Sequence, residues 1–172
     1  MPHKHDVPRP PARLILTTPE HLIAFGFGSG LAPVAPGTFG TLVGIPFYFA
    51  LSWLPWQAYV IAVALLFVFG CWVCGTSARL LQVHDYPGFV FDEIVGFLIA
   101  CAAFLPALGG PAWHPAVQIL AAFVLFRVFD IAKPWPIRVI DRHVHGGFGI
   151  MFDDAVAGLF AGAALWGLGQ VI

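Results

Sequence analysis

Charged residues are scarce in this chain of 172 residues. Only 10% of the residues are Asp, Glu, Lys or Arg, against about 25% in an ordinary soluble domain, and this argues against a water-soluble globule. The chain has eight Lys and Arg and a formal net charge of -1, so it also lacks the clustered cations that neutralise nucleic-acid phosphates. We therefore expect no nucleic-acid partner.

Apolar residues take the place of the missing charges. They make up 59% of the chain, and the mean hydropathy is +0.86. From Leu22 to Ser77 there is no acidic, basic or histidine residue, and such a run can cross a hydrocarbon core of about 30 Å more than once. The run is interrupted near Pro55, which lies between two tryptophans, a pattern typical of an interfacial turn. The bilayer is therefore the expected solvent.

The apolar stretches predict an all-α fold, a polytopic membrane helix bundle of about five spans, some of them short or re-entrant. The stretches cover residues 40–54, 58–78, 94–108, 116–126 and 155–172. With five spans the cations between them fall on one side, which the positive-inside rule makes cytoplasmic, together with the N-terminus. Residues 1–19 are polar and proline-rich and are expected to form a flexible cytoplasmic arm, while residues 20–172 form the membrane-embedded domain.

The acidic residues gather on the same predicted face as the cations. Asp92-Glu93 and Asp153-Asp154 each place two acids at the predicted cytoplasmic start of a span. One interpretation is helix capping, since a helix N-terminus favours an acid by about 0.3 to 1 kcal/mol, but capping uses one acid of each pair. If the third and fifth spans pack together, four carboxylates converge and a hard divalent cation would relieve their repulsion. The pattern favours a magnesium site.

A second charged group lies in the segment FRVFDIAKPWPIR, residues 126–138. Arg127, Asp130 and Lys133 recur every three residues, so they share one face of a helix, which Pro134 then ends. The spacing fits an ion-pair ladder worth about 0.2 to 0.5 kcal/mol per pair. It fits equally well a site in which the acid binds a metal while the bases bind an anion.

A glycine-rich segment, residues 26–41, precedes the first predicted span. Glycine lets backbone N–H groups approach a ligand, and the helix that follows has a positive N-terminus, so a phosphate could lie against Gly37 and Thr38. No Lys follows the last glycine, so the segment is not a P-loop. A re-entrant turn is the alternative interpretation.

Four ordered blocks in this chain resemble the phosphatidylglycerophosphatase A family of bacterial membrane lipid phosphatases. The blocks are GSGLAPVAPGT at 28–38, FDE at 91–93, FRVFDIAKPWPI at 126–137, and HGG at 145–147 followed by DDAVAG at 153–158. The resemblance covers about residues 20–165. It implies a magnesium-dependent hydrolase of the bacterial inner membrane, with a site that faces the cytoplasm. Its substrate would be the lipid phosphomonoester phosphatidylglycerophosphate, cleaved to phosphatidylglycerol and inorganic phosphate in phospholipid biosynthesis.

This resemblance and the charge pattern together give a mechanistic hypothesis. The residues expected to hold one or two Mg²⁺ ions are Asp92, Glu93, Asp130, Asp153 and Asp154. The groups expected to bind phosphoryl oxygens are Arg127, Lys133, Arg138 and the amides of Gly37 and Thr38. His84 or His145 would protonate the departing glycerol oxygen, although a solvated loop histidine is the simpler interpretation of each. The sequence leaves open whether water attacks directly or an aspartyl-phosphate forms.

Two other functions are compatible with the composition. A small transporter would need ionisable groups near the bilayer midplane, and the predicted span interiors contain almost none. A non-catalytic membrane lipid-binding or assembly protein would explain the hydrophobicity, but it gives no reason for two acid pairs beside a basic segment. The oligomeric state is not determined by the sequence.

Overall fold

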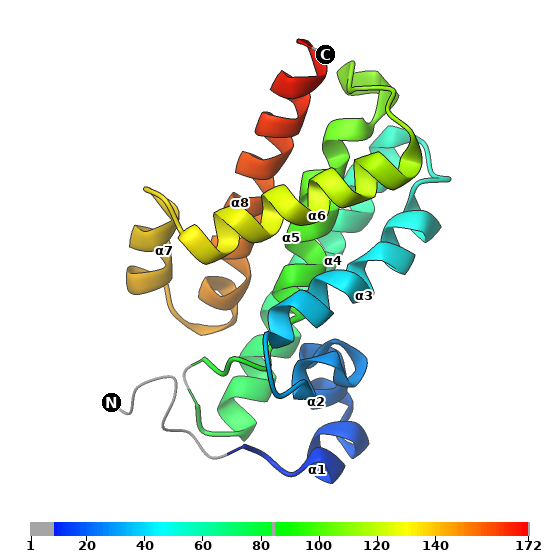
Figure 1. Ribbon diagram of the computed structural model, residues 1–172. Coiled ribbons are helices and arrows are strands. Elements are labelled where there is room, and N and C mark those ends of the chain that lie inside the picture. The colour runs from blue at the N-terminus through cyan, green and yellow to red at the C-terminus, as the bar shows by residue number, and fades with distance from the viewer. Residues whose placement is uncertain (1–8, 84, 172) are drawn as a thin grey trace.

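The computed structural model describes residues 9–83 and 85–171, and the regular elements within them are all helices (Figure 1). The five apolar helices are α3 (Pro36–Leu51), α4 (Trp56–Leu80), α5 (Phe91–Cys101), α6 (Pro115–Ala132) and α8 (Gly146–Gly169). Three of them, α4, α6 and α8, are long and apolar enough to cross a membrane, while α3 is a shorter apolar helix. The prediction of an all-α membrane bundle with some short spans is confirmed.

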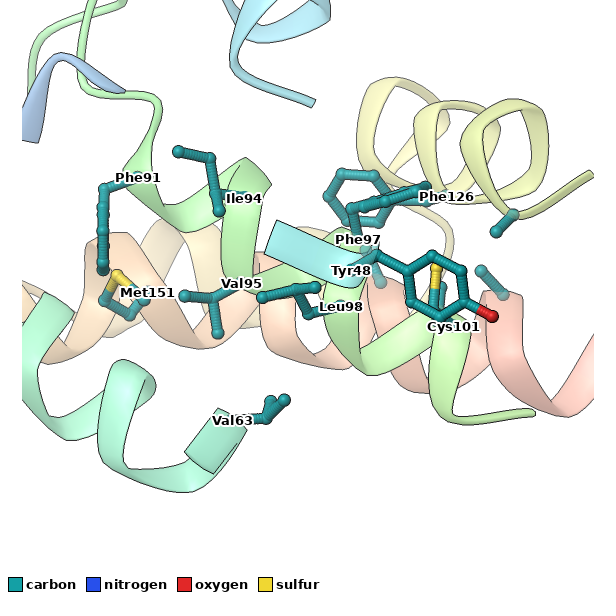
Figure 2. Close-up of a cluster of buried hydrophobic side chains, with 14 of the residues drawn as sticks. Tyr48, Val63, Phe91, Ile94, Val95, Phe97, Leu98, Cys101, Phe126 and Met151 are labelled. Atoms are coloured by element: carbon teal, nitrogen blue, oxygen red, sulfur yellow. The ribbon is translucent and has the colours of Figure 1, made fainter. Parts of the chain in front are cut away.

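Helix α5 forms the centre of the bundle because its sequence is apolar on every side. Apart from Asp92, Glu93 and Ile99, all its residues are buried. The helix packs against α3, α4, α6 and α8, and side chains from all five helices meet in one hydrophobic cluster (Figure 2). Two short 3-10 turns, η2 (Ala102–Phe104) and η3 (Pro106–Leu108), continue the chain after α5.

Glycine brings α5 and α8 into close contact. A Cβ atom on Gly96 would meet the Asp154 carbonyl at 2.8 Å, and one on Gly158 would collide with the Gly96 carbonyl oxygen. Small residues of this kind let the backbones of membrane helices approach one another. Asp92 lies four residues before Gly96, and Asp154 lies four residues before Gly158. The contact therefore places these two acids on adjoining turns of neighbouring helices.

The remaining helices lie toward the ends of the bundle. At the lower end of the bundle in Figure 1, beside the C-terminal part of α4, are α1 (Ala12–Thr17), α2 (Pro19–Ala24) and the 3-10 helix η1 (Gly26–Leu31). Within the predicted arm, α1 buries Ile15 completely. The short helix α7 (Ile137–His143) connects α6 to α8.

Helix α6 carries large apolar side chains on its outer surface. Leu120 is 64% exposed and Ile131 is 72% exposed. Val124 and Val128, which lie between them on the helix, are also exposed. An exposed apolar surface of this kind is costly in water and marks a contact with lipid or another protein. Together with the length of α4, α6 and α8, they favour a membrane environment for the bundle.

Candidate functional site

Three carboxylates come together where α5 packs against α8. They belong to Asp92 and Glu93 in the first turn of α5 and to Asp154 on α8. One ligand oxygen from each lies within 4.8 Å of the others. Asp154 is 4% exposed, so this acid is buried against the neighbouring helix. Of the four carboxylates predicted to converge, these three lie together, while Asp153 contacts Lys133.

Helix capping does not explain the acids on α8. This helix begins at Gly146 with His145 as its N-cap, so Asp153 and Asp154 lie about two turns inside it. On α5, the Asp92 Oδ1 atom accepts the Glu93 backbone N–H at 3.0 Å, which is a local contact in the first helical turn. The N-cap of α5 is Val90 and no side chain caps it, so the attraction of a helix N-terminus for acids stays an interpretation for Asp92 and Glu93 only.

The chemistry of the acid cluster suits a hard divalent cation. In the part of the chain that the structure describes, the buried Glu93 Oε2 atom has no hydrogen-bond partner. Three adjacent carboxylates in a low-dielectric site repel one another unless a proton or a cation compensates their charge. The donor set consists only of oxygen atoms, which Mg²⁺ prefers. Asp92, Glu93 and Asp154 thus fit a magnesium ion.

Arg127 joins the acid cluster to the charged face of α6. Its Nη1 atom donates to Asp130 Oδ2 at 2.6 Å and lies 3.7 Å from Glu93 Oε1. Of the predicted ladder on α6, the pair between Arg127 and Asp130 forms, and Arg127 also reaches across to α5. Lys133 ends the helix in a left-handed conformation and pairs with acids of α7 and α8 instead. The Arg127 Nε atom is buried and has no partner among the described residues. An N–H group left in this state favours an anionic ligand, because an unsatisfied buried donor costs about 1 to 3 kcal/mol.

The N-terminus of α3 lies directly against this arginine and Glu93. The chain enters α3 through Ala35, which has a left-handed conformation with φ 48°. A Cβ atom on Gly37 would collide with Glu93 Oε1 and would lie 2.9 Å from Arg127 Nη1. Only glycine therefore allows this approach. Gly37 and Thr38, the predicted phosphate cradle, lie where the positive end of a helix meets the acid cluster. The Thr38 N–H donates to the Ala35 carbonyl at 3.0 Å, so this amide of the predicted pair already has an acceptor.

Lys133 ties α6 to the two helices that follow it. Its Nζ atom donates to Asp141 Oδ1 on α7 at 2.7 Å and to Asp153 Oδ2 on α8 at 2.5 Å. Desolvation lowers the pKa of Lys133, but the two carboxylates outweigh it, and the pKa lies above its ordinary value. The Lys133 side chain is therefore a cation in the folded protein at neutral pH.

Other predicted site residues lie farther from the cluster or outside the described residues. Arg138 is exposed, and its guanidinium donates to the Ala132 carbonyl at 3.5 Å. His145 is exposed at the start of α8, about 12 Å along the helix axis from Asp153, at about 1.5 Å per residue. His84 lies outside the described residues.

Two acids without a predicted role also reach this region. Asp141 pairs with Lys133, and Asp85 acts electrostatically on Asp92 and Asp153. The sequence places both acids on the predicted cytoplasmic face, but each stands alone in a loop-like stretch. Adjacency, the signal that singled out the two acid pairs, is absent for them. Their contacts form only when the helices pack together.

A family model and two relatives of this chain carry the same description. A family model described as Phosphatidylglycerophosphatase A matches residues 22–169. The chain is 44% identical over 170 residues to phosphatidylglycerophosphatase A of Escherichia coli, a match that covers 99% of this chain and 94% of that protein. It is 46% identical over 153 residues to the protein of that name from Haemophilus influenzae, with 88% and 90% covered.

A further relative carries a different name. The chain is 38% identical over 145 residues to a Bacteroides thetaiotaomicron protein, with 81% of this chain and 87% of that protein covered. That relative is provisionally named a phosphatidylinositol-3-phosphatase. No solved structure matches the chain.

Proposed function

The chain belongs to the phosphatidylglycerophosphatase A family, and from this premise we propose that it hydrolyses phosphatidylglycerophosphate to phosphatidylglycerol and inorganic phosphate. Its relatives are phosphatases, so it is a phosphoric monoester hydrolase. One observation carries the choice of site. An acid cluster suited to a cation lies beside Arg127 Nε, a buried donor without a partner in the described residues, and the N-terminus of α3.

A lipid phosphomonoester suits the position of these groups in the bundle. The acyl chains of such a substrate stay in the bilayer, in contact with apolar helix faces such as that of α6. The phosphate then lies at the interface, near the helix ends that carry Asp92 and Gly37. We propose that this face is the cytoplasmic face of the bacterial inner membrane and that the reaction serves phospholipid biosynthesis.

The residues of this site divide into two groups in the proposed mechanism. Asp92, Glu93 and Asp154 would hold Mg²⁺, which when bound supplies charge neutralisation and activation of water. Arg127 and the Gly37 backbone N–H would bind phosphoryl oxygens, as donors aimed at the charge that develops there, whereas the Thr38 N–H already donates to the Ala35 carbonyl at 3.0 Å. Asp130 orients Arg127 through their 2.6 Å contact.

Proton transfer to the departing glycerol oxygen completes the proposed reaction. Histidine suits this step because its pKa lies near neutrality. His84 and His145 stay the predicted donors. Arg138 stays a predicted phosphate ligand.

The direct test is release of inorganic phosphate by the protein purified in detergent. With phosphatidylglycerophosphate and Mg²⁺ we expect turnover, because the proposed site joins a cation site to an anion site. EDTA is expected to abolish turnover, and excess Mg²⁺ to restore it. Phosphatidate and phosphatidylinositol 3-phosphate, assayed in parallel, report the headgroup preference. No release from any lipid phosphomonoester would favour the lipid-binding alternative, and turnover that resists chelation would contradict the cation site.

Gly37 offers a test of the approach between α3 and the acid cluster. The variant Gly37→Ala is expected to lower kcat about tenfold, because the added methyl group displaces Glu93 and Arg127, and a shift of about 1 Å can cost up to about 100-fold. Steady-state phosphate release measures the effect. Gly167→Ala is the matched control, since a Cβ atom there meets nothing within 4 Å. Equal activity of the two variants would contradict the proposed cradle.

A further inference from the structure

The outward face of α7 carries two arginines without an acidic partner among the described residues. Arg138 and Arg142 are both exposed, and a spacing of four residues puts them on one side of the helix. None of the ion pairs in the described part of the chain involves either of them. Arg127 and Lys133, in contrast, are each paired with acids. The face of α7 therefore presents two positive charges away from the bundle.

Large apolar side chains adjoin these arginines. Trp135, just before α7, is 82% exposed, and Val139, next to Arg138 in the helix, is 46% exposed. On the opposite side Ile137 is completely buried, so α7 packs on the bundle through that face. An exposed tryptophan is costly in water, but its amphipathic ring suits the boundary between lipid headgroups and hydrocarbon. The outer edge of α7 thus combines an interfacial aromatic ring with cations.

The position of α7 fits this boundary. Figure 1 shows the helix at the outer edge of the bundle, where α6 has ended. The last turn of α6 still has a surface suited to lipid, since Ile131 is 72% exposed. The chain then turns at Pro134 and Trp135 and begins α7 at Ile137. The arginines of α7 therefore follow directly after an apolar surface, as expected for residues at the level of the headgroups.

Anionic phospholipids have the chemistry that this edge can recognise. A guanidinium group binds two phosphate oxygens at once, and each basic residue beside an anionic membrane strengthens binding about fivefold. The acid of α7, Asp141, lies on the side of the helix that faces the bundle, where Lys133 Nζ contacts it at 2.7 Å. The charge on the outward face is therefore positive and complements a layer of lipid phosphates.

We propose that Trp135, Arg138, Val139 and Arg142 form a binding surface for the anionic phospholipids of the bilayer. The two guanidinium groups bind lipid phosphates, and the two apolar side chains contact the acyl chains below them. Arg138, predicted to bind the reacting phosphate, binds the phosphate of a bilayer lipid in this assignment. The inference goes beyond the proposed function, since these lipids are bound and not hydrolysed.

The first experiment titrates the full chain in a neutral maltoside detergent with phosphatidylserine and follows the unfolding temperature. Phosphatidylserine is anionic but has no phosphomonoester, so it is not a substrate of the proposed reaction. It is expected to stabilise the native protein more than phosphatidylcholine does, because a ligand of the folded state raises the unfolding temperature. Arg138→Gln/Arg142→Gln is expected to raise the half-saturating mole fraction of phosphatidylserine about 25-fold, from about fivefold for each arginine. An unchanged titration in this variant would overturn the proposal.

Two control variants separate this surface from general effects of charge. Arg13→Gln/Arg79→Gln removes the same charge from exposed positions outside α7, and it is expected to change the half-saturating mole fraction less than about twofold, because distant exposed charges are screened. Arg138→Lys/Arg142→Lys is expected to recover part of the affinity, since the positive charge is kept. Equal losses in the two glutamine variants, or no recovery with lysine, would contradict the assignment to α7.

Trp135 reports directly whether the outer edge of α7 contacts lipid. Its signal is the difference in fluorescence between the native protein and Trp135→Phe in mixed micelles. This signal is expected to be quenched strongly by phosphatidylcholine brominated near the glycerol end of its acyl chains, and weakly by acrylamide from the water phase. The reverse order would place the edge in water and overturn the proposal. Both readouts are independent of turnover, so a protein that binds phosphatidylserine as expected but releases no phosphate would contradict the proposed function alone.

Discussion

The variant Asp154→Asn is expected to release phosphate from phosphatidylglycerophosphate at least about 1,000-fold more slowly than the native protein. The loss should exceed that of a single hydrogen-bond donor to a reacting oxygen, because it removes a cation that neutralises the phosphoryl group. Asp154 is the buried member of the cluster, and the acid that α8 contributes to it. Initial rates at saturating lipid and Mg²⁺ measure the effect.

A thermal-unfolding experiment separates loss of the cation from loss of the fold. Without divalent cation, Asp154→Asn is expected to unfold at the native temperature or above it, because one of three adjacent repelling charges is gone. Addition of Mg²⁺ is expected to raise the unfolding temperature of the native protein and not that of the variant, since only a folded state that binds the ion is stabilised.

The matched control for Asp154→Asn is Glu20→Gln. It removes one acid from the first turn of α2, away from the cluster. This control is expected to keep both the phosphatase activity and the response of the unfolding temperature to Mg²⁺. Native activity in Asp154→Asn, or a full response of its unfolding temperature to Mg²⁺, would rule out Asp154 as a ligand.

Arg127→Gln is expected to lower kcat/KM by about 100- to 1,000-fold, the range for loss of one strong donor to a developing oxyanion. Arg127 contributes a buried Nε–H without a partner in the described chain, and it also holds Asp130 at 2.6 Å. Arg127→Lys is expected to recover little of the loss, because an ammonium group cannot bridge Asp130 and a phosphate as a planar guanidinium does.

The control for the charge of Arg127 is Arg13→Gln on the exposed surface of α1. This variant is expected to keep native kcat/KM. The Mn²⁺ affinity of Arg127→Gln serves as a second readout, and it is expected to be equal to or tighter than that of the native protein, because a nearby positive charge is removed. Full activity of Arg127→Gln would show that the phosphate is bound elsewhere.

The helices and the composition of the charged face were predictable because they depend on local signals. Charge-free stretches of sufficient length predict membrane helices whatever they pack against. The start of α8 was harder to place from the sequence. The fifth span is predicted to begin at about Ala155, which puts Asp153 and Asp154 at its start, yet α8 begins at Gly146 and the two acids lie inside it. Tertiary contacts favour the earlier start of the helix, since Gly147 packs closely against Cys71 of α4.

Sequence alone determined the solvent of this protein and the set of acids and bases from which its site is drawn. The four sequence blocks that resemble the family contain these acids and bases. Only the tertiary structure decided which acids lie close enough together to hold a common cation and which are paired with basic side chains. The close contact of Gly96 with Gly158 brings Asp92 to Asp154, while Lys133 takes Asp153. These distances depend on packing between helices distant in the chain, and no local pattern encodes them.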